Sequence, residues 1–107
     1  MPTEFTVTEK DGKTTVGVLN PDADYLLWQV NEADPGRVYF EYNDQSNGGY
    51  DVVREATLMR DGIHIVLDSG KLIHVYFSDV TEKTYCCFVE GLQGLYRGQP
   101  EVLEVLD

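Results

Sequence analysis

Two Asp-Gly dipeptides, Asp11-Gly12 and Asp61-Gly62, each lie between two runs in which apolar and polar residues alternate. Alternation with a period of two indicates strands, and Asp-Gly favours the positive φ angles of two-residue hairpin turns. Across the first turn the pattern places Val7 opposite Val16, so that apolar side chains meet. We therefore expect the chain to be built largely from β-hairpins.

The second half of the chain predicts three further strands. The run from Tyr50 to Arg60 leads into the second Asp-Gly turn, which would place Leu58 opposite Ile65. A third hairpin, closed by a three-residue loop centred on Gly70, would then place Ile65 opposite Val75. These strands would share one continuous apolar face.

The segment from Asp24 to Val30 is predicted to be a central strand, because both of its faces are largely apolar. It pairs with the run Val38 to Tyr42 if the chain returns antiparallel, which places Trp28 opposite Phe40. Glu41 and Tyr39 would then lie on the opposite face of the sheet from Phe40.

After Ser78 and Asp79, either of which could cap a helix, the apolar residues change to helical spacing. They form one stripe, made of Tyr85, Phe88, Val89, Leu92 and Tyr96. The tail after Pro100 fits a short helix or a closing strand. The elements together predict an α+β domain spanning residues 1–107: an antiparallel β-meander of about six or seven strands with one C-terminal helix packed on one face.

The chain of 107 residues carries 19 acidic and 8 basic residues, a formal net charge of -11. This charge repels phosphate, so neither nucleic acid nor an anionic membrane is expected as a partner, and a basic protein is favoured. Solubility alone is an alternative reason for the acidity. The start of the sequence lacks the basic and apolar regions of a secretory signal, and no apolar run is long enough to span a bilayer. Cys86 and Cys87 are predicted to be reduced, buried helix thiols, so we expect a cytoplasmic protein.

A polar stretch from Asn43 to Gly49 separates two strand-like runs and predicts a long loop at a sheet edge. Polar loops of this kind commonly bind partners. The candidate partner-binding residues are Glu41, Asn43, Asp44, Gln45, Asn47, Tyr50 and Asp51. The alternative is architectural, because Asn and Asp side chains before Gly-Gly also hydrogen-bond the backbone of their own loop.

His64, His74 and Tyr76 share a second face, where the predicted register offsets the two histidines by two positions. Two histidines at about 7 Å could ligate a metal, but no third ligand clearly joins them. This face is the alternative site, for a small ligand or metal, and pairing through a sheet edge to assemble a structure is a further alternative. No nucleophile with a base is identifiable, so we expect neither catalytic residues nor a cofactor.

The block Val38-Tyr39-Phe40-Glu41-Tyr42-Asn43-Asp44-Gln45, followed by Asn47-Gly48-Gly49-Tyr50-Asp51, resembles the signature of the tenth immunity-protein family of bacterial polymorphic toxin systems. The similarity extends over roughly residues 25–98, and includes the helix with Phe88 and Leu92. It implies a small cytoplasmic protein, a monomer or small homo-oligomer, that binds and neutralises a cognate toxin domain and is not an enzyme. A basic toxin, such as a nuclease, would fit the acidity of the chain.

Overall fold

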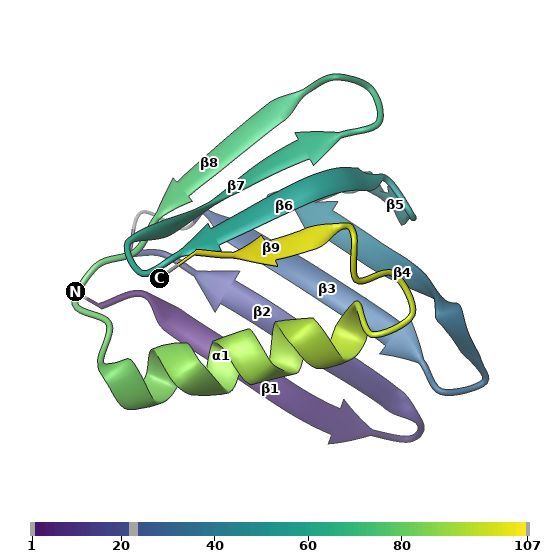
Figure 1. Ribbon diagram of the computed structural model, residues 1–107, viewed down its shortest axis with the longest axis horizontal. Helices are drawn as coiled ribbons and strands as arrows, with labels where there is room; N and C mark the ends of the chain where they lie inside the picture. Colours follow the sequence, from purple (N-terminus) through teal and green to yellow (C-terminus); the bar gives the residue numbers. More distant parts are fainter. Residues whose placement is uncertain (1, 22–23, 107) are drawn as a thin grey trace.

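The structure is a computed structural model that describes residues 2–21 and 24–106, except for the side chain of Gln45 (Figure 1). Within these residues it forms the strands β1 (Glu4–Lys10), β2 (Lys13–Leu19), β3 (Tyr25–Asn31), β4 (Asp34–Tyr42), β5 (Asp44–Tyr50), β6 (Val53–Met59), β7 (Gly62–Leu67), β8 (Leu72–Tyr76) and β9 (Leu103–Val105), and the helix α1 (Glu82–Leu95). The prediction of an α+β fold with antiparallel strands and one C-terminal helix is confirmed.

The strands form two sheets rather than one continuous meander. One sheet has the order β1-β2-β3-β4-β5, and the other has the order β8-β7-β6-β9. All neighbours are antiparallel except β9, which runs parallel to β6. Figure 1 shows the sheets as separate layers, with α1 lying over β1 and β2. The described residues form nine strands rather than about six or seven. The additional strands are β5, where a loop was predicted, and β9, which shows that the tail is a closing strand rather than a helix.

A single apolar core joins both sheets and the helix. Trp28 and Phe40 from the first sheet, Leu58 and Ile65 from the second, and Phe88 from α1 all have fully buried side chains. Such burial stabilises the fold by about 1.5–3 kcal/mol for each large apolar side chain. The predicted helical stripe is thus confirmed as the face that α1 presents to the core.

The helix begins differently from the prediction. Its N-cap is Thr81, whose hydroxyl accepts a hydrogen bond from the backbone N–H of Thr84. Ser78 and Asp79 lie before the helix, and Asp79 has a φ angle of 51°. Ser78 instead donates its backbone N–H to the Thr3 hydroxyl at 2.8 Å, which fastens this segment to the beginning of the chain.

Two registers were predicted in the first sheet, β1 with β2 and β3 with β4, and both are confirmed. Val7 lies opposite Val16, and Trp28 lies opposite Phe40. The reason is that a two-residue turn at Asp11-Gly12 leaves one register that puts apolar on apolar, and both turn residues have positive φ angles of 53° and 76°.

In the second sheet, the predicted pairings of β6 with β7 and of β7 with β8 are each wrong by two residues. Leu58 lies opposite Ile63 rather than Ile65, and Ile65 lies opposite Ile73 rather than Val75. The same faces remain buried, because a shift of two residues keeps each side chain on its side. Gly62 belongs to β7 itself, where an added Cβ would lie 2.6 Å from the backbone oxygen of Val75.

The predicted long polar loop is also wrong. Asn43, with a φ angle of 60°, makes the turn almost alone, and β5 returns along β4 so that Tyr50 lies opposite Tyr39. Asp51, with a φ angle of 54°, then redirects the chain, so the strand expected from Tyr50 to Arg60 begins at Val53. Polar and glycine residues are poor strand formers, but pairing with β4 at a sheet edge overrides that preference.

Cys86 and Cys87 are free and exposed, so the expectation of buried thiols is wrong. Neither is among the buried residues of α1, which are Tyr85, Phe88, Leu92 and Leu95. Among the described residues, no helix has the length and apolar character needed to cross a membrane.

Candidate functional site

The face of β3, β4 and β5 that points away from the core carries a group of aromatic and charged residues. We call Tyr25, Arg37, Tyr39, Glu41 and Tyr50 the tyrosine cluster. They alternate along the strands with core residues, and cross-strand pairing brings them together, for example Tyr39 opposite Tyr50. The cluster is therefore assembled from three strands of one sheet.

Glu41 lies at the centre of the cluster and is only 9% exposed. Its Oε1 accepts a hydrogen bond of 2.7 Å from the Tyr39 hydroxyl, and its Oε2 accepts one from the Tyr25 hydroxyl. The hydrogen bond to Glu41 is the main reason why the pKa of Tyr25 is raised to about 12, with burial and the negative charge of Glu41 adding to it. The separate hydrogen bond that Tyr39 donates to Glu41 is the main reason why the pKa of Tyr39 is also raised. Both carboxylate oxygens are thus occupied, and the two tyrosine rings are held in place.

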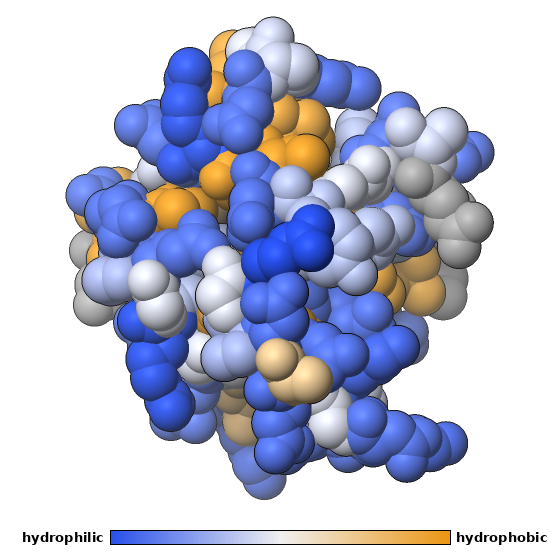
Figure 2. All heavy atoms as spheres, turned by 90° about the vertical axis from the view of Figure 1, so that its right-hand side faces the viewer, coloured by the Kyte–Doolittle hydropathy of each residue, from blue (hydrophilic) through white to orange (hydrophobic). Residues whose placement is uncertain are grey.

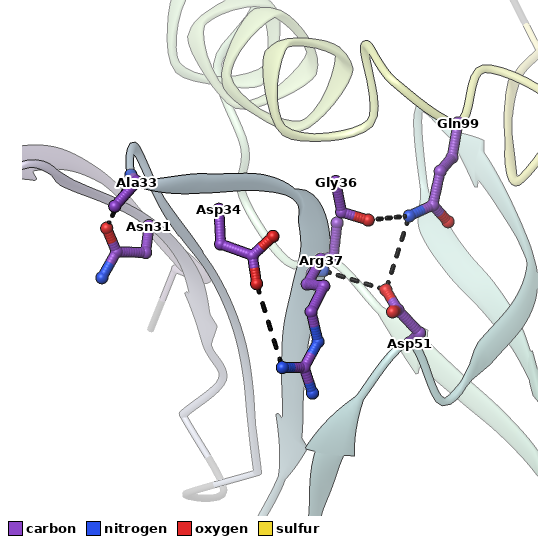
Figure 3. Close-up of polar contacts among 8 residues, drawn as sticks. Asn31, Ala33, Asp34, Gly36, Arg37, Asp51 and Gln99 are labelled. Atoms are coloured by element: carbon purple, nitrogen blue, oxygen red, sulfur yellow. Dashed lines mark hydrogen bonds and ion pairs between the residues drawn. The ribbon is translucent and has the colours of Figure 1, made fainter.

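Tyr50 extends the cluster toward solvent and is 55% exposed. Its ring meets that of Tyr39 edge-on, with centroids 5.4 Å apart, and the Arg37 guanidinium lies 4.2 Å from its centroid. Arg37 also approaches the Asp34 carboxylate at 3.8 Å (Figure 3). Tyr50 is therefore an exposed aromatic ring supported by its neighbours rather than a free side chain.

A polar pocket of about 180 Å³ adjoins the cluster. It is lined by Lys13, Gln29, Asn31, Asp34, Arg37, Tyr39 and Tyr50. Two of the eight basic residues of the chain meet here, which makes the pocket less acidic than the net charge of -11 would suggest.

Asp51, one of the sequence-selected residues, has a structural role. Its Oδ1 accepts a hydrogen bond of 3.0 Å from the backbone N–H of Val38 and one of 3.4 Å from the Gln99 amide. The same Gln99 amide donates to the backbone oxygen of Gly36 at 2.8 Å (Figure 3). Asp51 thus ties β4 to the segment that follows α1.

Asn43 holds its turn in place. Its Oδ1 accepts the backbone N–H of Tyr25 at 2.7 Å, and its amide donates to the Asp24 carboxylate at 2.9 Å. These bonds attach the β4–β5 turn to the beginning of β3. The architectural alternative therefore describes the hydrogen bonds that Asn43 makes in this structure.

The side chains of Asp44 and Asn47 also hold the backbone near the β4–β5 turn in place. The Asp44 carboxylate accepts the backbone N–H of Ser46 at 2.9 Å, and this bond lowers the pKa of Asp44. The Asn47 amide donates to the backbone oxygen of Tyr42 at 3.0 Å. Gln45 lies in β5, but its side chain is outside the described part of the structure. Of the residues selected from the sequence, Glu41 and Tyr50 alone belong to the tyrosine cluster.

Sequence reasoning did not select Tyr25, Arg37 or Tyr39 as site residues. A signal was present, because Tyr25 shares a strand face with Leu27 and Gln29, but that face was used only to predict a central strand. The side chains of Tyr25, Leu27 and Gln29 are half-buried in the structure. The strand is central in its sheet, as predicted, but no second layer covers this face within the described residues.

The alternative site on the second sheet is also rearranged. His64 lies directly opposite His74 rather than two positions away, and the ring centroids are 5.4 Å apart. His74 stacks on Tyr76 at 4.4 Å. Within residues 2–21 and 24–106, no group of three or more His, Cys, Asp or Glu side chains is arranged to hold a metal ion.

Hydrophilic residues dominate the side of the molecule seen in Figure 2, and hydrophobic ones gather mainly in the upper part of that view.

Comparisons with protein-family models, with curated proteins and with solved structures gave no match for this chain. The geometry of the tyrosine cluster and the resemblance in the sequence are therefore the two observations that bear on function.

Proposed function

We propose that this chain is a non-catalytic immunity protein that binds and neutralises a cognate bacterial toxin domain, with the tyrosine cluster as the centre of its interface. The observation that carries the proposal is the exposed Tyr50 ring, which is supported by Arg37 and by the Tyr39–Glu41 pair. Tyrosine and arginine are enriched among the residues that dominate binding energy in protein interfaces.

The rigidity of the cluster supports a binding role. A side chain that is fixed before binding loses less conformational entropy when the complex forms. Tyr25 and Tyr39 are fixed by Glu41, and Gly48 allows Tyr39 to lie against β5. The block that resembles the immunity-protein signature supplies Tyr39, Glu41 and Tyr50, so the resemblance and the geometry select the same strands.

Charge supports a basic partner. The chain has a net charge of -11, whereas the centre of the cluster has one carboxylate whose oxygens are occupied. Interfaces of this kind have a core depleted in charge and a charged rim that speeds association. Affinity for a basic toxin should therefore fall as salt concentration rises.

The test is protection of a sensitive bacterium that expresses the neighbouring toxin-like gene. We expect wild-type protein to protect and to co-purify with the toxin, and Tyr50→Ala to abolish both. Tyr76→Ala is a matched control, because Tyr76 is 67% exposed on the outer face of the other sheet. Urea unfolding followed by the fluorescence of the buried Trp28 establishes that each variant is folded.

Two results would contradict the proposal. Wild-type protein that gives neither protection nor a complex would reject the immunity function for that toxin. Loss of protection in Tyr76→Ala, with Tyr50→Ala unaffected, would move the interface to the His64, His74 and Tyr76 face.

A further inference from the structure

The outer edge of β1 is the least protected sheet edge in the described part of the chain. β1 is seven residues long, is paired with β2 in an unbroken register, and has no strand on its other side (Figure 1). Regular exposed edges of this length are ready to pair with another strand. The β1 edge can therefore pair with a strand of another chain.

The other three edges are each shortened or interrupted. β9 has three residues, and the register of β5 with β4 is irregular between Phe40 and Tyr42. β8 has five residues, and the Asn20 amide donates to the backbone oxygen of Tyr76 at 3.0 Å. Short strands, bulges and covering groups are the means by which proteins protect sheet edges. β1 is neither short nor bulged, and of the usual protections it has charged side chains, on Glu4, Glu9 and Lys10.

The hydrogen-bonding groups of β1 are arranged to accept a strand. Lys10 and Lys13 flank a two-residue turn and form a hydrogen-bonded pair, and such pairs alternate along an antiparallel ladder. The backbone N–H and C=O groups of Phe5, Val7 and Glu9 are therefore directed away from β2. Antiparallel pairing centred on Val7 would satisfy all of them.

The side chains of β1 are complementary to a second copy of the same strand. About a two-fold axis at Val7, Glu4 lies opposite Lys10 of the second copy, and Lys10 lies opposite its Glu4. Thr6 lies opposite Thr8, and Val7 lies opposite Val7 of the second copy, whereas Phe5 lies opposite Glu9 and is the one unlike pair. Opposite charges, paired threonines and paired β-branched residues are all favourable cross-strand neighbours. The strand is thus matched to itself in charge at its two ends and in shape at its centre.

An apolar groove runs beside this edge. It has a volume of about 720 Å³, and its lining includes Phe5 and Val7 of β1 and Thr84, Cys87, Phe88 and Gly91 of α1. Val7 is 45% exposed in it. A two-fold axis perpendicular to the sheet keeps both α1 helices on the same side, so the groove of each copy would continue into that of the other.

We propose that β1 is a homodimer interface, through which two copies form one continuous ten-stranded sheet by antiparallel β1–β1 pairing centred on Val7. The tyrosine cluster lies on β3, β4 and β5 at the opposite end of the sheet. The dimer would therefore carry two separated toxin-binding faces, and its formation does not depend on toxin.

Sedimentation of the purified chain over a hundredfold concentration range tests the interface. We expect a reversible dimer, and Glu4→Lys should weaken it by ~10-fold or more, because two attractive cross-strand pairs become repulsive. The double variant Glu4→Lys/Lys10→Glu should restore association, since it exchanges the charges and keeps the net charge. Glu101→Lys, in the turn before β9, is the control for the charge change alone.

Three outcomes would overturn the proposal. They are a wild-type chain that stays monomeric at every concentration, a dimer that Glu4→Lys leaves unchanged, and a dimer that the charge exchange does not restore. Val7→Lys provides a second check, since it places like charges at the two-fold axis at a residue whose side chain is already exposed in the monomer.

Discussion

Replacing Gly48 with alanine should disturb the tyrosine cluster without touching its side chains directly. A Cβ at Gly48 would lie 2.6 Å from the Tyr39 hydroxyl oxygen and 3.1 Å from the backbone oxygen of Phe40. Carbon–oxygen contacts this short are repulsive, so the Tyr39 ring must move. The movement breaks the 2.7 Å hydrogen bond between the Tyr39 hydroxyl and Glu41.

Two effects set the size of the loss. Inserting a methyl group into a well-packed site costs about 1–3 kcal/mol, and losing one hydrogen bond costs about 0.5–1.5 kcal/mol. Tyr39 is half-buried and can shift toward solvent, which reduces both contributions. We therefore expect Gly48→Ala to lower the free energy of unfolding by about 2 kcal/mol.

Urea unfolding monitored by Trp28, the single tryptophan and a fully buried one, measures this change. Gly36→Ala is the control, because nothing lies within 4 Å of an added Cβ there, and it should change stability by less than about 0.5 kcal/mol. In a Tyr39→Phe background the closest contact is gone, so Gly48→Ala should cost about 1 kcal/mol less. Equal costs in both backgrounds, or a stable Gly48→Ala protein, would refute the argument.

The remaining predictions concern Tyr25 in the tyrosine cluster and two residues of α1, Gly94 and Phe88. The folded-state pKa of Tyr25 is raised from 10.0 to about 12, so the hydrogen bond from Tyr25 to Glu41 stabilises the fold fully below pH 10, and this stabilisation is lost as the pH rises toward 12. Titration of tyrosine absorbance should show that Tyr25 ionises at a higher pH than an ordinary tyrosine. Glu41→Gln should shift that ionisation to lower pH. Gly94→Ala, at an open helical position, should raise the free energy of unfolding in urea by about 0.5–1 kcal/mol, and an unchanged or lower value would contradict this. Phe88→Ala removes a fully buried ring and should lower that free energy by about 3–5 kcal/mol in the same assay.

Much of the fold was predictable because side-chain periodicity is a local property. The alternation around Val16 and Trp28 identifies the buried face of each strand, and the helical spacing around Phe88 identifies the buried face of α1. The Asp11-Gly12 turn fixes its register, since two residues leave the chain one way to return.

The candidate site was predictable only in part. Glu41 and Tyr50 were selected because they border a polar stretch, and they do lie in the tyrosine cluster. The same polarity also selected Asn43 and Asp51, whose side chains hold turns together. Composition cannot separate these roles, because both require hydrogen-bonding groups near a turn.

The sequence by itself determined which faces of the predicted strands and of α1 enter the core, where the first hairpin turns, and that the chain is acidic. Only the tertiary structure decided that the polar stretch is an edge strand, that His64 faces His74, and that Tyr25 meets Glu41 across 16 residues of chain. The physical reason is range. Burial follows from the alternation of neighbouring residues, whereas register and side-chain clusters depend on contacts between distant backbones, such as that of Gly62 with Val75.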